Sequence, residues 1–366
     1  MKKAGIIMVT VLLSLIGIMV LGLLVVLLNS PGKLEPLKDE QGKIIQGSIS
    51  EKVWVEVNGI KQGMFIRAEN PKNPIVLYVH GGPGNPMLQF ISAVEKNERL
   101  EKYFTVCYWD QRGAGITYSK STDPLTMTAE QMVEDTRVIT EYLKARFGQD
   151  KIFLLGHSWG SYLGVKTVEK YPQNYIAYIG MGQSTYGKES ERLSHDYMLN
   201  RAKAINDKEV IVKMEKYDPL ANDFPSLEYL LKDRTNTLER YGIGRMHQGV
   251  ALKDMLKAFF VFKGYTLREK INWFRGSDFS MIYLLHIPMN DNLFISSAKF
   301  DVPFYIIQGV YDYMTSQVLA EKYLDLIEAP KKEYFSFTDS AHSPNMEEPE
   351  RFTGILRKIA SENLND

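Results

Sequence analysis

The sequence contains almost no cysteine and carries no net charge, and each absence excludes a class of protein. Its 366 residues include one cysteine, Cys107, so an internal disulfide and a cysteine-based metal cluster are both excluded. Cys107 lies in an apolar run, which predicts a buried structural thiol. The 44 basic and 44 acidic residues balance. The chain therefore has no bulk attraction to nucleic acid or to anionic lipid.

Linkers rich in glycine, serine or proline are also absent, as are low-complexity tracts and internal repeats. The length suits one large domain or two ordinary ones, and a hydrophobic content of 45% can build a sizeable core. No feature of the sequence sets an oligomeric state.

The N-terminus holds a long apolar run from Ala4 to Leu28, preceded by Lys2 and Lys3. About 20 apolar residues cross a bilayer as a helix, whereas a secretory signal has an apolar core of about 7–15 residues and a small-residue cleavage site. No cysteine follows the run, which excludes lipoprotein anchoring. We therefore predict an uncleaved membrane anchor over residues 1–29. The two lysines place its N-terminus in the cytoplasm and the bulk of the chain outside. The alternative is a signal peptide whose cleavage gives a secreted protein.

The most informative stretch is Lys151–Gly164, KIFLLGHSWGSYLG. Its apolar run, Ile152–Leu155, predicts a strand buried on both faces, and a helical pattern follows Gly160. Strand, G-x-S-x-G and helix in this order form a nucleophile elbow, a tight turn that needs flanking glycines and holds the serine hydroxyl above the sheet. Ser158 is thus the candidate nucleophile. The backbone N–H of Trp159 and the helix N-terminus lie beside it and favour an oxyanion.

A second strand, Pro74–Val79, runs into the glycine-rich loop His80–Gly84, HGGPG. Glycines let the backbone of such a loop approach a substrate oxygen, so the loop is predicted to supply the second N–H of an oxyanion hole. Gly82 is the preferred donor and Gly81 the alternative.

The order of the predicted elements is that of a doubly wound α/β protein with an insertion. The predicted elements are a hairpin over 44–68 around Asn58-Gly59, strands at Pro74–Val79, Phe104–Trp109, Ile176–Met181, Pro303–Ile307 and Glu333–Phe337, and helices at Thr128–Phe147, Ser316–Ile327 and Pro349–Glu362. In the loop after Trp109, Asp110 and Arg112 are expected to form a bracing ion pair. From Tyr186 to about Phe294 the alternation gives way to helical segments, Ser194–Met214 among them.

An all-helical insertion between two α/β parts fits a lid over the C-terminal edge of the sheet. We therefore predict a mostly parallel, doubly wound sheet with an inserted helical lid and one N-terminal transmembrane helix. The predicted segments are the anchor 1–29, a juxtamembrane spacer 30–43, the first part of the core 44–185, the lid 186–298 and the second part of the core 299–366.

A serine hydroxyl is a weak nucleophile until a histidine takes its proton, and that histidine needs an acid to orient it. In hydrolases with this elbow the chain order is serine, acid, histidine. Ser158, Asp312 and His342 have that order, and each follows a predicted strand. The other five histidines lie on the elbow, in the glycine-rich loop or in the predicted lid. Among rival acids, Asp301 precedes its strand and Asp339 crowds the histidine, so Asp312 is preferred.

Five motifs together resemble the proline iminopeptidase branch of the α/β-hydrolase superfamily. They are HGGPG at His80–Gly84, WDQRG at Trp109–Gly113, GHSWGS at Gly156–Ser161, GVYD at Gly309–Asp312 and AHSP at Ala341–Pro344. The resemblance covers about 55–185 and 300–360. It implies a serine peptidase of family S33 type that removes an N-terminal residue, often proline, from short peptides. Ser158 would be the nucleophile, Asp312 the orienting acid, His342 the base, and Gly82 with Trp159 the oxyanion hole.

The resemblance also implies that acids from the lid hold the free amine of the substrate. Glu189 and Glu191 are the nearest candidates, and a solvated lid surface is the alternative for both. The same triad would serve a carboxylesterase or lactonase with an apolar acyl pocket under the lid. A third possibility is a peptide-binding protein that has kept the fold without catalysis. Acyl transfer by a triad needs no cofactor, and the sequence shows no clustered metal-ligand motif.

Overall fold

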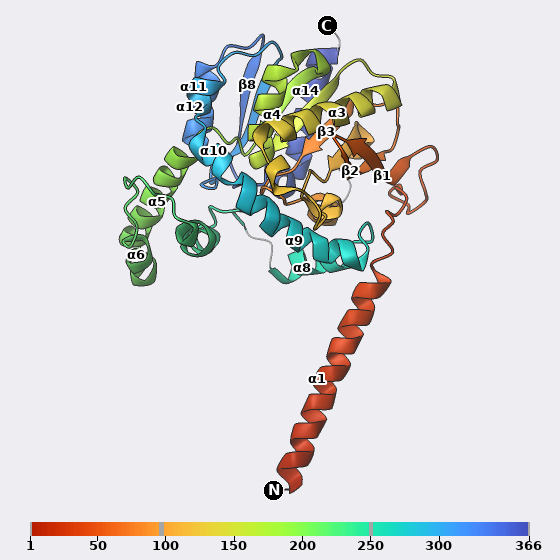
Figure 1. Ribbon diagram of the computed structural model, residues 1–366, viewed down its shortest axis with the longest axis vertical. Helices are drawn as coiled ribbons and strands as arrows, with labels where there is room; N and C mark the ends of the chain where they lie inside the picture. The colour runs from red at the N-terminus through yellow and green to blue at the C-terminus, as the bar shows by residue number, and fades with distance from the viewer. Residues whose placement is uncertain (1, 95–98, 249–251, 365–366) are drawn as a thin grey trace.

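The computed structural model describes residues 2–94, 99–248 and 252–364, so Met1 and residues 365–366 of the predicted end segments lie outside it. Its centre is an eight-stranded sheet with the strand order β1-β2-β4-β3-β5-β6-β7-β8 (Figure 1). The strands are β1 (Ile49–Val57), β2 (Ile60–Ala68), β3 (Ile75–Val79), β4 (Thr105–Trp109), β5 (Ile152–His157), β6 (Tyr175–Met181), β7 (Phe304–Gly309) and β8 (Lys332–Phe337). All of the predicted strands are confirmed.

The sheet begins with an antiparallel hairpin and continues as a parallel sheet. Asn58 and Gly59 have φ angles of 44° and 83°, the two positive values that a type I′ hairpin turn requires. Strand β2 pairs antiparallel with β4, and each later pairing, from β4 with β3 to β7 with β8, is parallel. The carboxyl ends of the parallel strands therefore meet at one edge, where a site is expected.

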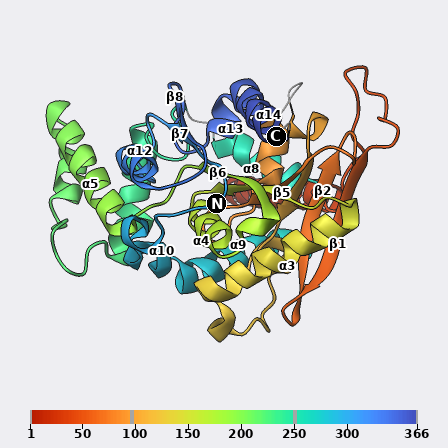
Figure 2. The same ribbon diagram turned by 90° about the horizontal axis from the view of Figure 1, so that it is seen from above.

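Both faces of the sheet are buried, because alternate residues of its central strands enter two different cores. Leu77 and Leu154 belong to one core, whereas Tyr78 and Phe153 belong to the other. The first core is completed by α3 (Ala129–Phe147), α4 (Trp159–Lys170) and α12 (Gln317–Leu326), and the second by α2 (Leu88–Val94), α13 (Pro344–Glu347) and α14 (Pro349–Leu364). Figure 2 shows α3 and α14 on opposite sides of the sheet. Short helical turns are η1 (Leu100–Lys102), η2 (Gly115–Thr117), η3 (Pro124–Thr126) and η4 (Pro172–Asn174).

Between β6 and β7 the described chain is helical, as predicted for the lid. The elements are α5 (Gly187–Ala204), α6 (Lys208–Met214), the π-helical segment η5 (Tyr229–Arg234), α7 (Thr235–Arg240), α8 (Leu252–Val261), α9 (Leu267–Leu284), α10 (His286–Asn290) and α11 (Leu293–Ser296). The segment Ser194–Met214, predicted to be helical, is divided between α5 and α6. Asn206 has a φ of 56°, and the Asp207 side chain accepts from Val210 N, so the chain starts a new helix there. The domain boundaries themselves stay a prediction.

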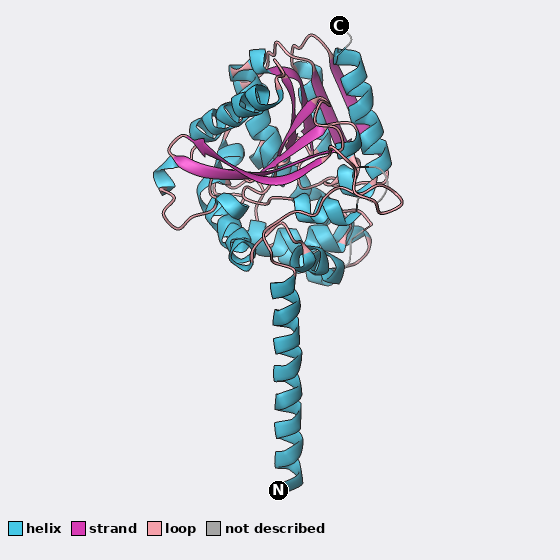
Figure 3. Cartoon of the chain, turned by 90° about the vertical axis from the view of Figure 1, so that its right-hand side faces the viewer, coloured by secondary structure: helices cyan, strands magenta, loops and turns pink. Residues whose placement is uncertain are grey.

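The N-terminal helix α1 (Lys2–Leu28) projects from the underside of the protein (Figure 3). Among the described residues it is the one helix long and apolar enough to cross a membrane. Its segment Thr10–Leu28 has a mean hydropathy of 3.1, and none of it is buried inside the protein. A membrane anchor and a signal sequence both have this character.

The predicted ion pair between Asp110 and Arg112 is wrong, because the two side chains point to different partners. Arg112 is buried and pairs with Asp135 on α3 through two contacts, Nε to Oδ2 at 2.7 Å and Nη2 to Oδ1 at 3.0 Å. Asp110 instead accepts from the backbone N–H of Ile116 at 2.9 Å, and burial raises its pKa to about 8. Cys107 is buried as predicted, and burial raises the pKa of its thiol.

Replacing Arg112 by methionine leaves the Asp135 carboxylate buried without its counter-charge. We expect Arg112→Met to lower the free energy of unfolding by about 3–5 kcal/mol. Arg137→Met, which breaks the partly exposed pairs with Glu134 and Glu141, is the control and should cost at most about 1 kcal/mol per pair. Urea unfolding of the full chain in detergent measures both. Equal losses of unfolding free energy in the two variants would show that the Arg112–Asp135 pair contributes no more to stability than a surface pair.

Candidate active site

Ser158 lies in a tight turn between β5 and α4, with a φ of 55°. The turn leaves no room for side chains on either side of it. A Cβ on Gly156 would lie 2.3 Å from the Gly160 carbonyl oxygen, and a Cβ on Gly160 would lie 2.0 Å from the Val79 carbonyl oxygen. The elbow predicted from G-x-S-x-G is therefore present, with its serine half-buried at the carboxyl edge of the sheet.

The glycine-rich loop after β3 lies against this serine. A Cβ on Gly81 would lie 2.9 Å from Ser158 Cβ, and Gly82 has a φ of 114°, which favours glycine. Trp159 is the first residue of α4, so its backbone N–H is one of the four that a helix leaves without an intrahelical partner. Gly81, Gly82 and Trp159 all line the same cavity as Ser158. The residues predicted to donate to an oxyanion thus line the same cavity as the hydroxyl.

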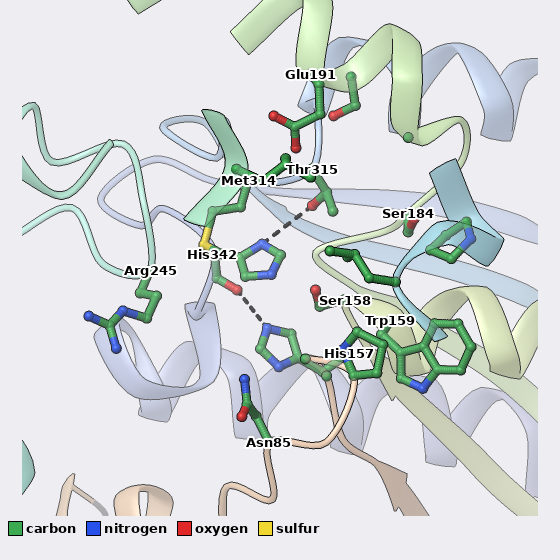
Figure 4. Close-up of a pocket in the computed structure, with 18 of the residues that line it drawn as sticks. Asn85, His157, Ser158, Trp159, Ser184, Glu191, Arg245, Met314, Thr315 and His342 are labelled. Atoms are coloured by element: carbon green, nitrogen blue, oxygen red, sulfur yellow. Dashed lines mark hydrogen bonds between the residues drawn. The ribbon is translucent and has the colours of Figure 1, made fainter. Parts of the chain in front are cut away.

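The loops after β7 and β8 bring Asp312 and His342 together. Asp312 is fully buried, and its Oδ2 lies 2.7 Å from Nδ1 of His342. Nε2 of His342 is buried and has no hydrogen-bond partner in the described part of the chain. Figure 4 shows this imidazole beside the Ser158 hydroxyl. The rival acids Asp301 and Asp339 are both exposed to solvent.

The Asp312 carboxylate is held by four further hydrogen bonds. It accepts from the backbone N–H groups of Met314 (2.9 Å) and Thr315 (3.0 Å), from the Thr315 hydroxyl (3.0 Å) and from Nε2 of Gln308 (2.7 Å). These donors satisfy a buried charge and keep the carboxylate in one orientation. The His342 ring is therefore oriented by a rigid partner.

His157 holds His342 from the other side. Its Nε2–H donates to the His342 carbonyl oxygen at 2.9 Å, and the two rings lie 4.8 Å apart. Burial and the neighbouring His342 lower the pKa of His157 to about 3. His80, in the glycine-rich loop, has its pKa lowered by burial to about 4. Both histidines are neutral at physiological pH and act as hydrogen-bonding groups.

Gln111, in the WDQRG motif, contacts both the HGGPG loop and the GHSWGS elbow. Its Nε2 donates to the His80 carbonyl oxygen at 2.8 Å, and its Oε1 accepts from the Trp159 indole at 3.0 Å. Its backbone N–H also donates to Nε2 of His80 at 3.2 Å. One amide side chain thus joins the glycine-rich loop to the elbow and sets their spacing.

The cavity over Ser158 has a volume of 240 Å³ and is closed on the lid side by α5, η5 and α9. Glu191 lines it and is buried, with Oε2 at 2.6 Å from Nε of Arg234. Burial raises the pKa of Glu191. Glu189 does not line the cavity; it is half-exposed and pairs with Arg192 at 2.6 Å. The two predicted amine-binding acids therefore separate, one inside the pocket and one at the surface of α5.

An apolar groove continues from this cavity through the lid. It has a volume of 510 Å³ and runs between η5 and the end of α9. The residues that it shares with the cavity are Leu230, Leu231, Met281, Leu285 and Met289. In the part of the chain that the structure describes, no group of three or more His, Cys, Asp or Glu side chains could hold a metal ion.

Residues 74–209 match the model of the alpha/beta hydrolase fold family. The probable aminopeptidase YbaC of Bacillus subtilis is 30% identical over 314 residues, which cover 85% of this chain and 96% of the relative. The proline iminopeptidase of Saccharolobus solfataricus is 25% identical over 293 residues, 78% of this chain and 84% of the relative. The chain is an α/β-hydrolase of the proline iminopeptidase-like branch. The crystal structure of proline iminopeptidase from Mycobacterium smegmatis has the same fold as this hydrolase, with a TM-score of 0.59 at 14% identity over 86% of this chain and 99% of that one.

Sequence reasoning about this α/β-hydrolase missed Gln111, Arg234 and Thr315. Gln111 stands in the WDQRG motif, and its place just past a strand end was a usable signal. Arg234 meets Glu191 only through the packing of η5 on α5, 43 positions along the chain, and no sequence pattern marks that contact. Thr315 contacts both Asp312 and His342 and follows the acid by three residues.

Because the pKa values of His157 and His80 lie at about 3 and about 4, neither ring changes charge between about pH 5 and 8. Neither ring should therefore contribute to the pH dependence of turnover over this range. His157→Leu should leave the shape of the pH–rate profile between about pH 5 and 8 unchanged and lower kcat by roughly fivefold, the equivalent of a hydrogen bond of about 1 kcal/mol. A pH–rate profile on both proteins measures this. A proton-dependent step in the parent that disappears in the variant would contradict a neutral His157.

Proposed function

We propose that this hydrolase is a membrane-anchored serine aminopeptidase that releases N-terminal residues from short peptides. The observation that carries the proposal is the presence of a buried carboxylate, Glu191, in the same cavity as Ser158. A free amine is the group that distinguishes the substrate of an aminopeptidase from an internal peptide bond. Among the described residues that line the cavity, Glu191 is the acidic side chain, and it can bind this amine.

In the proposed reaction, the Ser158 hydroxyl attacks the carbonyl carbon of the N-terminal residue while Nε2 of His342 takes its proton. Asp312 holds the ring in the tautomer with hydrogen on Nδ1 and stabilises the imidazolium. The backbone N–H groups of Trp159 and Gly82, or Gly81 in its place, stabilise the oxyanion. His342 then protonates the departing amine. Water, activated by the same histidine, releases the N-terminal residue from Ser158.

Only one oxygen of Glu191 is occupied in this arrangement. Oε2 accepts from Arg234, while Oε1 makes no hydrogen bond to any described residue. Arg234 also donates to the Met314 carbonyl oxygen at 3.0 Å, which fixes the pair beside the loop that carries Asp312. An ammonium group of the substrate would bind Oε1 and favour the ionised carboxylate that burial disfavours.

Glu191→Gln tests this role, with Glu189→Gln as the matched control on the same helix. For proline and alanine arylamides, Glu191→Gln should lower kcat/KM by about 10–100-fold, because a hydrogen bond to a charged group is worth about 1.5–3 kcal/mol. Glu189→Gln should leave these rates unchanged. Turnover of p-nitrophenyl acetate, which has no amine, should be unchanged in both variants and shows that they are folded.

Ser158→Ala is the control for the chemistry and should lose both arylamide and ester turnover. It should also lose covalent labelling by a fluorophosphonate, whereas labelling of the parent would exclude a non-catalytic binding protein. If the parent hydrolyses esters but no arylamide, the aminopeptidase is excluded and the triad retained.

The apolar groove favours a second candidate function, a carboxylesterase that uses the same triad. A groove lined by Leu, Met and Ile side chains next to the catalytic cavity would accept an acyl chain. The acyl group would be attacked by Ser158 with its tail lying between η5 and α9. The same oxyanion donors and base serve this reaction, so the lid alone distinguishes the two candidates.

Met281→Trp, which narrows the groove where it joins the cavity, separates these candidates. For an esterase we expect a loss of turnover that grows with acyl length, seen by comparing p-nitrophenyl acetate with p-nitrophenyl decanoate. Leu326→Trp, on the exposed side of α12, is the control for the added ring. Equal rates for all chain lengths in Met281→Trp would exclude the groove as an acyl site.

We also propose that α1 is an uncleaved anchor that holds the catalytic part outside the cytoplasm, on the basis of its length, its exposed apolar surface and the two lysines with which it begins. The alternative is a signal sequence. The N-terminal sequence of the mature protein from membranes distinguishes them, because a cleaved protein would start beyond Leu28.

A further inference from the structure

The juxtamembrane segment is fixed to the lid and does not form a free tether. Pro31, three residues after α1, forms an antiparallel bridge with Thr266, and Lys33 N donates to the Lys263 carbonyl oxygen at 3.0 Å. Nζ of the nearly buried Lys270 donates to the carbonyl oxygens of Asn29 at 2.8 Å and Phe260 at 2.6 Å. One ammonium group thus joins the end of α1 to the end of α8 and the first turn of α9.

This connection places α8 and α9 beside the point where α1 leaves the protein. Figure 1 and Figure 3 both show the lid helices at the underside, directly above α1. The buried side of α9 packs toward the sheet, since Ser280 Oγ donates to the Gly113 carbonyl oxygen at 3.0 Å and Gly276 lies against the same loop. The opposite side of α9 therefore faces away from the sheet, toward the side from which α1 projects.

That outward side carries large apolar residues in place of the polar ones a water-exposed helix presents. On α9, Ile271 is 45% exposed, Phe274 47% and Ile282 71%, at spacings that place them on one side of the helix. On α8, the large apolar side chains that are exposed are Leu256, Phe260 and Val261. The ring of Phe274 lies 5.1 Å from that of Phe259, so the two helices form one surface, which we call the α8–α9 surface.

Basic residues accompany these apolar side chains. Lys253, Lys257, Arg268 and Arg275 are exposed on the same two helices, and none of them has an acidic partner among the described residues. The exposed acidic residues there are Asp254 and Asp278. Aromatic and aliphatic side chains with an excess of lysine and arginine characterise helices that lie in the membrane interface.

We propose that the α8–α9 surface lies in the outer interface of the bilayer that α1 crosses, with its apolar side chains among the lipid chains and its basic residues against anionic headgroups. The short connection from Leu28 to Pro31 leaves the surface no room to stand away from the membrane. Ile282 also lines the mouth of the apolar groove. The groove that leads to Ser158 therefore opens at the lipid surface.

The full chain, reconstituted in vesicles of phosphatidylcholine and phosphatidylglycerol, tests this placement. Single cysteines are introduced at Ile271 and Phe274 and labelled with a fluorophore, while the buried Cys107 stays unlabelled. Val318→Cys is the matched control: Val318 is 46% exposed and belongs to α12, a helix that Figure 1 shows on the far side of the protein from α1. Quenching of a label on Leu21→Cys, within α1, would show that the chain has inserted into the bilayer.

Brominated lipids should quench the labels at positions 271, 274 and 21 and leave the label at 318 unquenched. Quenching at 271 and 274 should weaken in vesicles without phosphatidylglycerol and at high salt, because the headgroup attraction is screened. If positions 271 and 274 are no more quenched than 318 while 21 is quenched, the proposal is wrong. Disulfide crosslinking of two unlabelled chains through the cysteine at 271 under an added oxidant, without lipid quenching of the labelled protein, would assign the surface to a second copy and also overturn the proposal.

Discussion

The site depends on close backbone-to-backbone contacts in the elbow, which leave no room for a side chain at Gly156 or Gly160. Strand β3, strand β5 and helix α4 touch through Gly156 and Gly160, where a Cβ would lie within 2.3 Å of a carbonyl oxygen. This contact forces Ser158 into a positive φ, a conformation that costs about 1–3 kcal/mol in a residue other than glycine and persists only where the packing around it is rigid. It also brings the glycine-rich loop to the hydroxyl. The positions of the proposed nucleophile and of its proposed oxyanion donors thus follow from one packing constraint.

The parts of this arrangement that follow from strands could be predicted from the sequence, and the parts that follow from helix packing could not. His80, Ser158, Asp312 and His342 each follow a predicted strand, and a parallel sheet brings such strand ends to one edge whatever lies between them. Asp110 and Arg112 misled the prediction because residues two apart in a turn point in different directions, and only the fold shows that Asp135 is the partner. The Glu191–Arg234 contact depends on how η5 packs against α5, which hydrophobic periodicity does not specify.

The charge of the cavity over Ser158 decides which substrate groups it can bind. A lone buried carboxylate would attract any cation, but Glu191 is already paired with Arg234, so the pair is close to neutral as a unit. In the proposed aminopeptidase, the substrate amine therefore binds by hydrogen bonding to the remaining carboxylate oxygen more than by long-range attraction. The groove beside the pair is lined mainly by apolar side chains, and its charged and titratable lining residues are Lys188, Asp223 and His286. The proposed amine site and the proposed acyl site thus adjoin in the helical insertion, and the balance between the two proposed functions depends on few side chains.

The position of the lid also constrains how substrate reaches Ser158. Leu34 and Leu37 of the juxtamembrane segment are buried in the core, and Lys270 ties the end of α1 to α8 and α9. The lid therefore cannot tilt relative to α1 without breaking these contacts. Tilting would also expose the two backbone carbonyl oxygens to which the Lys270 ammonium group donates. If α1 is the proposed anchor, a lid that is rigid against it keeps the same face toward the membrane. On that proposal, substrates that partition into the interface would be concentrated at the groove, whereas fully soluble peptides would have to approach from the side.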